Sequence, residues 1–273
     1  MPGRGNRMSE GGVRWDAEAY ARASEAQLRW ARELIGKLSL QGSESVLDIG
    51  CGDGKVTAEI ARLLPRGETV GIDSSAEMVR KAQSAFPAAR NPRLSFQLMD
   101  ARALSFEAKF DVAFSNAALH WLKEHGPMLK GVARSLKPGG KVLFQMGGQG
   151  NGEEIFDVAR RMISAPPWRE FFSRFQFPWG FYAPREYEGW CRDAGLRVQR
   201  LELLPRDMVQ QGTDGLASWV RTTWMPYTER VPEQRREDFI REAVDRYAAS
   251  HPADSQGRIT VRMVRLEVEA TKG

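Results

Sequence analysis

The stretch VLDIGCGDGKVT, from Val46 to Thr57, decides the fold of this chain. A short apolar run leads into a loop with glycines at alternate positions, Gly50, Gly52 and Gly54, and the loop continues into a helix-like segment. Strand, glycine turn and helix in this order are typical of a ligand-binding turn, because glycine adopts positive φ angles and leaves the main chain open to close approach. The free N–H groups at the start of the helix then point at the ligand.

The spacing of the glycines distinguishes between cofactors. A dinucleotide fold requires G-x-G-x-x-G, whereas the third glycine here comes one residue early. The stretch does not supply the phosphate loop G-x-x-x-x-G-K-[ST] either. The pattern D-x-G-x-G-x-G, which begins at Asp48, resembles instead the first motif of class I S-adenosylmethionine-dependent methyltransferases. The plainer alternative is an ordinary tight turn between a strand and a helix.

The composition fits one large α/β domain, or one domain plus a cap, in a chain of 273 residues. Lys and Arg are interleaved with Asp and Glu, so the formal net charge of +5 favours no particular acidic partner. Two cysteines and three histidines argue against a disulfide framework or a structural zinc site and suit a reducing cytoplasm. No apolar run reaches the length of a membrane span, and residues 1–14 are expected to be a disordered leader.

Five short apolar segments are predicted to be strands separated by helical stretches, at residues 45–49, 68–73, 94–98, 110–115 and 141–146. This alternation predicts a doubly wound, mainly parallel α/β sheet of the Rossmann-like type. Ligands bind such sheets outside the carboxyl ends of the strands. Glycines and polar acceptors gather at those ends: Asp48, Gly50, Gly52, Asp73, Asp100 and Asn116.

Asp73 ends the second predicted strand, 19 residues after Gly54. An acidic residue at this place binds ribose hydroxyls, because a carboxylate offers two acceptor oxygens to two vicinal O–H groups. The alternative is a helix N-cap, since Asp-Ser-Ser precedes a predicted helix. Ser74 or Ser75 could be the cap instead, which leaves Asp73 for the ribose, and we favour this interpretation.

Segments beyond the glycine loop extend the resemblance. FSNAALHWL at residues 114–122, the Pro-Gly-Gly turn that follows it, and WVRTTWMPY at residues 219–227 are similar to the trans-aconitate methyltransferase group. By pattern and order the likeness covers about residues 15–272. It implies a seven-stranded, mainly parallel sheet with a helical cap, and S-adenosylmethionine as the cofactor.

The resemblance also implies roles for single residues. Related enzymes meet the adenine amino group with an acidic residue after the third strand, here Asp100, and use an N-terminal helix as a lid. Helical spacing predicts such a helix from residue 15 to 38, where Tyr20 either contacts the cofactor or packs against the domain. The implied cofactor-binding set is Tyr20, Asp48, Gly50, Cys51, Gly52, Asp73, Ser74, Met78, Asp100, Ala101 and Asn116, with no metal.

We expect one methyltransferase domain over residues 15–272. Its expected parts are a cofactor-binding core at 15–150, a cap and substrate region at 151–250, and a final strand at 258–272. The alternation of apolar and polar residues in that strand slips between Met263 and Val264, for which a β-bulge is one explanation. Arg262 and Arg265 also stand where the resemblance leads us to expect a more apolar strand.

The expected methyl acceptor is a carboxylate oxygen of a small molecule, which would give a methyl ester. A carboxylate is already ionised at pH 7, whereas a hydroxyl or an amine usually needs a general base. His120 is a candidate for that base, or for a hydrogen-bond donor to a carboxylate, and Trp121 is a candidate wall of the methyl-transfer site. For both residues the plainer alternative is a structural role. Arginines could hold a carboxylate, and the second half offers Arg185, Arg221, Arg262 and Arg265.

Three alternatives to carboxylate methylation remain. The first is O-, N- or C-methylation of a natural-product intermediate, with His120 as base. A nucleic-acid methyltransferase is disfavoured, because enzymes that act on a base amine carry [DNS]-P-P-[YFW] where this chain has Ser-Asn-Ala-Ala at residues 115–118. The last is a non-catalytic scaffold, against which the intact acidic and glycine positions argue. The sequence leaves the oligomeric state open.

Overall fold

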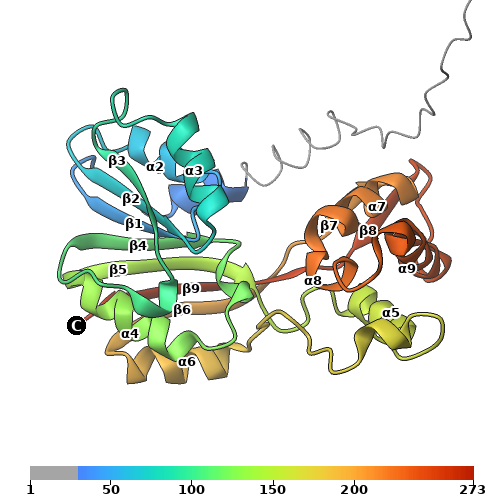
Figure 1. The fold of residues 1–273 in the computed structure, drawn as a ribbon. Helices are drawn as coiled ribbons and strands as arrows, with labels where there is room; N and C mark the ends of the chain where they lie inside the picture. Colours follow the sequence, from blue (N-terminus) through green and yellow to red (C-terminus); the bar gives the residue numbers. More distant parts are fainter. Residues whose placement is uncertain (1–29) are drawn as a thin grey trace, which may run out of the picture.

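The computed structural model describes residues 30–273. Its centre is a seven-stranded sheet in the order β3-β2-β1-β4-β5-β9-β6 (Figure 1). The strands are β1 Ser45–Ile49, β2 Glu68–Asp73, β3 Leu94–Leu98, β4 Phe110–Asn116, β5 Leu136–Gly147, β6 Leu196–Pro205 and β9 Val264–Lys272. Strands β1 to β5 pair in parallel, and β9 runs antiparallel to both β5 and β6. The predicted doubly wound, mainly parallel sheet is therefore confirmed.

Helices cover both faces of the sheet. Successive apolar side chains of β1 point to opposite faces, and each one packs against the helices on its own face. Val46 packs with α2 (Lys55–Arg62) and with helical residues 30–36. Leu47 belongs to the core under α4 (His125–Ser135) and α6 (Pro184–Asp193). Helix α3 (Ala76–Ala85) packs beside α2 on β3. Within residues 30–273, four short 3₁₀ helices lie between the larger elements: η1 Ala101–Ala103, η2 Leu119–Trp121, η3 Arg169–Phe172 and η4 Glu233–Arg235.

A second lobe, the cap, lies beside the sheet (Figure 1). It consists of α5 Glu153–Ile163, η3, β7 Met208–Gln211, α7 Gly212–Thr223, α8 Met225–Thr228, η4, α9 Arg236–Ser250 and β8 Arg258–Val261. The cap has a hydrophobic core of its own, in which aromatic rings from several of these elements pack together, Phe156 against Trp224 and Trp168 against Phe239 among them. Not all of residues 151–250 belong to it, since α6 and β6 complete the sheet layer.

The prediction of one final strand over residues 258–272 is wrong. The segment divides at residues 262–263 into β8, which pairs with β7 in the cap, and β9, which joins the main sheet. The slip in the sequence pattern marks this division and not a bulge. Ile259, Val261 and Met263 are buried in the cap core, whereas Leu266 and Val268 are buried in the sheet core.

The predicted turn at residues 137–140 lies inside β5, where it interrupts the regular pairing with β4. Phe110 pairs with Leu136, but Val112 pairs with Lys141, and Gly139 has a φ of 72°.

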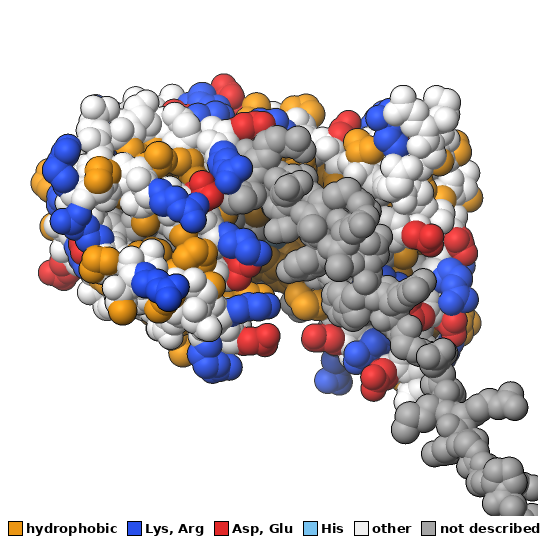
Figure 2. Space-filling model, turned by 90° about the horizontal axis from the view of Figure 1, so that it is seen from above, with side chains coloured by type: hydrophobic (Ala, Val, Ile, Leu, Met, Phe, Trp, Pro, Cys, Tyr) orange, Lys and Arg blue, Asp and Glu red, His pale blue; other side chains and the backbone are white. Residues whose placement is uncertain are grey.

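The surface mixes charges on both lobes, and Figure 2 shows Lys and Arg side chains beside Asp and Glu. None of the helices that the structure describes is long and apolar enough to cross a membrane.

Candidate active site

The backbone fixes the shape of the glycine loop at the end of β1. The N–H groups of Gly50 and Cys51 both donate to the carbonyl of Ile72 on β2, at 2.8 and 2.9 Å. Gly50, Gly52 and Gly54 have φ angles of 78°, 53° and 82°, a region that favours glycine. A Cβ on Gly50 would lie 2.2 Å from the Cβ of Ala118, whereas a Cβ on Gly52 would meet nothing within 4 Å. Gly52 therefore leaves space above the loop.

The Asp73 carboxylate joins this loop to the start of α3. Its Oδ2 accepts a hydrogen bond from the N–H of Gly52 at 3.0 Å, and its Oδ1 accepts one from the N–H of Ser75 at 2.8 Å. The N-cap of α3 is Ser75, whose hydroxyl accepts from the N–H of Met78. Asp73 is thus not the helix cap, and each of its oxygens keeps a lone pair for another donor.

Asp48 lies beneath the loop and is only 2% exposed. Its Oδ2 accepts a hydrogen bond from the Thr57 hydroxyl at 2.6 Å. The pKa of Asp48 is raised to about 7, mainly by burial; the Thr57 hydrogen bond opposes this rise and the charge of Asp73 adds to it. Two carboxylates therefore lie close together at the carboxyl end of β1 and β2, which favours a cationic ligand there.

A cavity of about 460 Å³ lies between the sheet and the cap, within the usual range for small-molecule sites. The sheet side contributes Asp48, Gly50, Cys51, Gly52, Asn116, Gln145 and Arg265, and the cap contributes Gln210, Gly215, Ser218, Trp219, Thr222 and Thr223. Met78 of α3 and Trp30 also line it. Six of the predicted cofactor-binding residues thus meet at one cavity: Asp48, Gly50, Cys51, Gly52, Met78 and Asn116.

Other predicted cofactor residues lie outside the cavity lining. Asp73, the exposed Ser74, and Ala101 of η1 are among them. Asp100 caps η1 by accepting from the N–H of Arg102 and also pairs with the Arg102 guanidinium, which lowers the pKa of Asp100. A contact to adenine would share that carboxylate with Arg102. Tyr20 lies outside the described residues.

His120 and Trp121 lie in η2, just after β4, and neither lines the cavity. The Nδ1 atom of His120 accepts a hydrogen bond from the N–H of Gly147 at 3.3 Å. Burial, together with the nearby positive charge of Arg265, lowers the pKa of His120 to about 3. A neutral ring whose Nδ1 is an acceptor carries its proton on Nε2. Trp121 is 44% exposed and meets Trp179 edge to face, with 5.6 Å between ring centroids.

The structure separates the four candidate arginines. Arg221 forms two hydrogen bonds with Glu237, Arg262 pairs with Glu154, and Arg185 is exposed. Arg265 lines the cavity, and its guanidinium has no ion pair or hydrogen bond with any residue from 30 to 273. Its guanidinium carbon lies 5.9 Å from the ring centroid of Trp30. Burial lowers the pKa of Arg265 to about 10, so the group is a cation at neutral pH.

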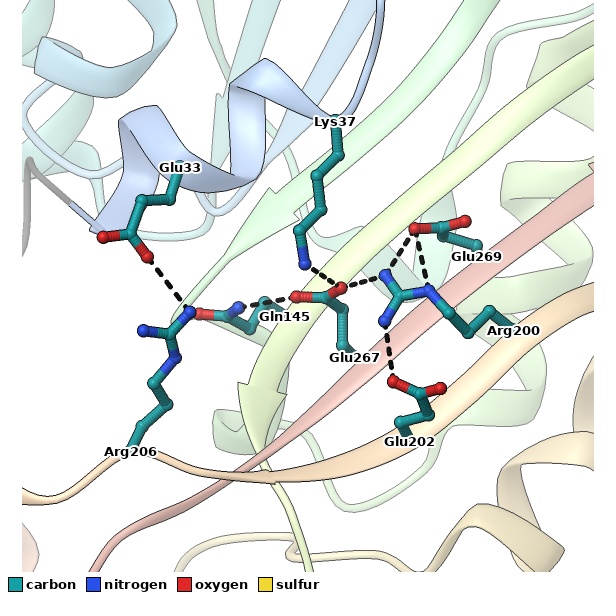
Figure 3. A network of polar contacts seen from close by, with 8 residues as sticks. All are labelled: Glu33, Lys37, Gln145, Arg200, Glu202, Arg206, Glu267 and Glu269. Carbon is teal, nitrogen blue, oxygen red and sulfur yellow. Dashed lines mark hydrogen bonds and ion pairs between the residues drawn. The ribbon is translucent and has the colours of Figure 1, made fainter.

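A polar network surrounds Glu267, which lies two residues after Arg265 on β9 (Figure 3). Glu267 of β9 is fully buried, and its Oε1 accepts from both Lys37 and Arg200. Its Oε2 accepts from the Nε2 of Gln145 at 2.9 Å. Arg200 also pairs with Glu202 and Glu269. Burial raises the pKa of Glu267, but the hydrogen bonds from Lys37, Arg200 and Gln145 outweigh burial and hold it below its usual value.

Sequence reasoning missed the cap wall of the cavity, and Trp30 and Gln145 with it. The wall has a detectable signal, because Gly215, Ser218, Trp219, Thr222 and Thr223 follow helical spacing and form one stripe of α7. The opposite side of α7 buries Leu216 and Val220 in the cap core. Among residues 30–273 no group of three His, Cys, Asp or Glu could hold a metal ion.

Comparison with known proteins shows similarity to methyltransferases along almost the whole chain. Residues 46–140 match the methyltransferase domain family. Trans-aconitate 2-methyltransferase of Azoarcus sp. (strain BH72) is 30% identical over 263 residues, which cover 94% of this chain and 99% of the relative. The enzyme of the same name from Agrobacterium fabrum is 28% identical, with 94% and 99% covered.

Solved structures share the fold at lower identity. The YcgJ protein of Bacillus subtilis superposes with a TM-score of 0.60 at 19% identity and covers 89% of this chain and 98% of its own. Geranyl diphosphate methyltransferase in complex with its methyl donor has a TM-score of 0.59 at 15% identity, with 97% and 93% covered.

Proposed function

This chain belongs to the family of class I S-adenosylmethionine-dependent methyltransferases that includes trans-aconitate 2-methyltransferase, and on that premise we propose that it methylates a carboxylate oxygen of a small organic acid. It is a methyltransferase that acts on a small molecule, and its cofactor is S-adenosylmethionine. The acceptor atom and the acid are the proposed part.

The described residues fit this cofactor. S-adenosylmethionine supplies a methyl group on a sulfonium cation. Gly52 leaves room above the glycine loop, Asp73 retains acceptor capacity for hydroxyl donors, and the buried Asp48 adds negative charge near the positively charged centre. Methyl transfer is an in-line displacement, so the main contribution of the protein is to align the reactants, which is worth up to about 7–11 kcal/mol in well-oriented systems.

The observation that carries the proposal is Arg265. This partly desolvated guanidinium lines the cavity and has no ion pair or hydrogen bond in the described part of the chain. A cation left unpaired in a partly desolvated site calls for an anionic ligand, and a guanidinium matches the two oxygens of a carboxylate. A carboxylate held in this way has its charge neutralised and its lone pairs engaged. We therefore propose that the methyl group goes to a second carboxylate of a polycarboxylic acid, for which trans-aconitate, named for the relatives, is the first compound to test.

The state of His120 supports a carboxylate acceptor over a hydroxyl. A general base needs a free lone pair directed at the proton that it removes. The Nδ1 lone pair of His120 is engaged by the N–H of Gly147, and its Nε2 carries the proton. His120 can therefore donate a hydrogen bond but is poorly suited to remove a proton, and a carboxylate requires no such step.

The experiment uses S-adenosylmethionine labelled in its methyl group. The protein is incubated with trans-aconitate, with other small di- and tricarboxylic acids and with a cell extract, and the products are then treated with mild base. Label released as volatile methanol supports a methyl ester. Label that stays non-volatile means transfer to a hydroxyl oxygen, nitrogen or carbon and contradicts the proposal. Arg265→Met in the same assay tests whether the acid depends on the guanidinium.

Two further parts of the proposal concern the setting of the reaction. Cys51 and Cys191 are both unpaired and buried, which supports action in the reducing cytoplasm. The acceptor cavity lies between the lobes and not along an exposed basic groove, which supports a small-molecule substrate over nucleic acid.

A further inference from the structure

Arg265 and Glu267 have opposite charges and lie two residues apart on β9. Side chains at alternate positions of a strand share one face of the sheet, about 7 Å apart along the strand. The long side chain of an arginine spans that distance. Both residues are described in full, yet no ion pair joins them. An unpaired guanidinium beside a buried carboxylate needs an explanation, because pairing would lower the free energy of both groups.

The explanation is that three donors, two of them cations, already contact the carboxylate of Glu267. Lys37 and Arg200 both donate to its Oε1, and Gln145 donates to its Oε2 (Figure 3). The two cations come from separate parts of the chain, Lys37 after the first helical segment and Arg200 from β6. Two cations thus already contact Glu267, although Arg200 is shared with Glu202 and Glu269, and neither oxygen of Glu267 lacks a donor.

We infer that Arg200 and Lys37 are positioning residues, which occupy Glu267 and so keep Arg265 available to bind the substrate carboxylate. Without them, Glu267 would capture the guanidinium of Arg265, and the cavity would lose its positive charge. The role of Arg265 toward substrate rests on the proposed function, whereas the competition between the cations for Glu267 does not.

The test begins with Arg200→Met, which removes one competing cation but keeps a side chain of similar length. With trans-aconitate as the acceptor, we expect KM for the acid to rise roughly tenfold, the equivalent of about 1.4 kcal/mol. The turnover at saturating acid and the affinity for S-adenosylmethionine should stay unchanged. Arg200→Lys should restore the low KM, and Lys37→Met should raise KM in the same direction.

The second step adds Glu267→Gln to the Arg200→Met variant. This double variant has no carboxylate to capture Arg265, so KM should return toward the value of the unmodified protein. A purely structural role for Arg200 predicts the opposite, because removing two members of a buried network should be at least as damaging as removing one. Arg197→Met is the matched control, since Arg197 lies on the same strand and is exposed.

A crystal structure of Arg200→Met separates this inference from the proposed function. We expect the guanidinium of Arg265 to lie within ion-pairing distance of Glu267. An Arg265 that stays unpaired there, or a double variant with a KM as high as that of Arg200→Met, overturns the inference. If trans-aconitate is not methylated but the new ion pair forms, the choice of acid is wrong and the competition for Glu267 stands.

Discussion

The carboxylate of Asp73 accepts a hydrogen bond from the backbone N–H of Gly52, with 3.0 Å between Oδ2 and N. One acidic side chain thus ties the end of β2 to the glycine loop that follows β1. The same carboxylate is the predicted partner of the ribose hydroxyls, and on that prediction loop geometry and cofactor binding would depend on one group.

Replacement of Asp73 by Ala is expected to weaken S-adenosylmethionine binding by about 1.5–3 kcal/mol, the scale of hydrogen bonds to a charged group. Isothermal titration calorimetry measures the change. Glu77→Gln, in the first turn of α3, is the control for loss of a nearby negative charge. An unchanged dissociation constant in Asp73→Ala would remove Asp73 from the cofactor site.

Two glycines of the loop should respond differently to alanine. At both positions alanine must adopt a positive φ, at a cost of roughly 1–2 kcal/mol. In Gly50→Ala the new Cβ would also collide with Ala118, so this variant should melt at a clearly lower temperature. Gly52→Ala has room in the protein, so its melting temperature should fall by only about 2–4 °C for each kcal/mol of strain.

The same pair separates stability from binding. The methyl of Gly52→Ala would occupy the space above the loop, so this variant should lose affinity for S-adenosylmethionine while it stays folded. Thermal melts with and without cofactor measure both effects. If Gly52→Ala binds as tightly as the unmodified protein, the cofactor does not lie on this part of the loop.

Asp48 should couple cofactor binding to pH. Its pKa is raised to about 7, so at neutral pH a substantial fraction of the carboxyl is protonated. A sulfonium cation nearby favours the ionised form, so S-adenosylmethionine should bind more tightly as the pH rises from roughly 6 to 8 and should release a proton on binding. Titration calorimetry in two buffers of different ionisation enthalpy counts that proton, and Asp48→Asn should abolish it.

The free energy of unfolding without cofactor should change with pH in the opposite direction to cofactor affinity, falling as the pH rises. A folded-state pKa above the ordinary 3.8 means that the folded state binds this proton more tightly than the unfolded state. The contribution of Asp48 is therefore fully present at low pH and is lost as the pH rises toward and through about 7. Denaturant unfolding of Asp48→Asn should lack this part of the pH dependence. An identical profile in both proteins would show that Asp48 titrates normally.

Replacement of His120 by Asn should cost less than about tenfold in turnover, because the proposed carboxylate acceptor needs no base. The Asn side-chain oxygen can still accept from the N–H of Gly147. General bases contribute about 10²–10⁴ to rate, so a loss of that size would indicate proton removal and hence a hydroxyl or amine acceptor. Single-turnover rates at saturating substrate make the comparison.

Replacement of Arg265 should weaken binding of the acid but not binding of the cofactor. Arg265→Met is expected to weaken binding of the acid by about 1.5–3 kcal/mol, as for a hydrogen-bonded charged pair, and to leave S-adenosylmethionine affinity unchanged. Arg265→Lys keeps the charge but loses the planar fork and should fall between the two proteins. An equal loss of cofactor affinity would place Arg265 in the cofactor site instead.

The sequence was informative where one local pattern determines one local structure. Strands β1 to β3 begin and end as predicted, because buried parallel strands are short apolar runs bounded by turn residues. Ser75 was among the expected caps of α3 because small hydroxyl residues before a helix satisfy its first N–H groups.

The acceptor end of the cavity could not be predicted in the same way. Four arginines looked alike in the sequence, and only tertiary pairing distinguishes Arg265 from Arg221, whose partner Glu237 lies 16 residues away. Lys37 meets Glu267 across 230 residues of chain, and no periodicity reports such a contact. Asp100 was expected to be available for adenine, but its pairing with Arg102, two residues on, had no visible signal.

The separate hydrophobic core of the cap has a consequence for how enzymes of this build diversify. The cap can hold its fold while the five residues on the cavity side of α7 change, because Leu216 and Val220 on the other side anchor that helix. The glycine loop and its acidic partners lie on the sheet and are untouched by such changes. Substitutions on this side of α7 would therefore reshape the cap wall of the cavity while the glycine loop and Arg265 on the sheet stay in place.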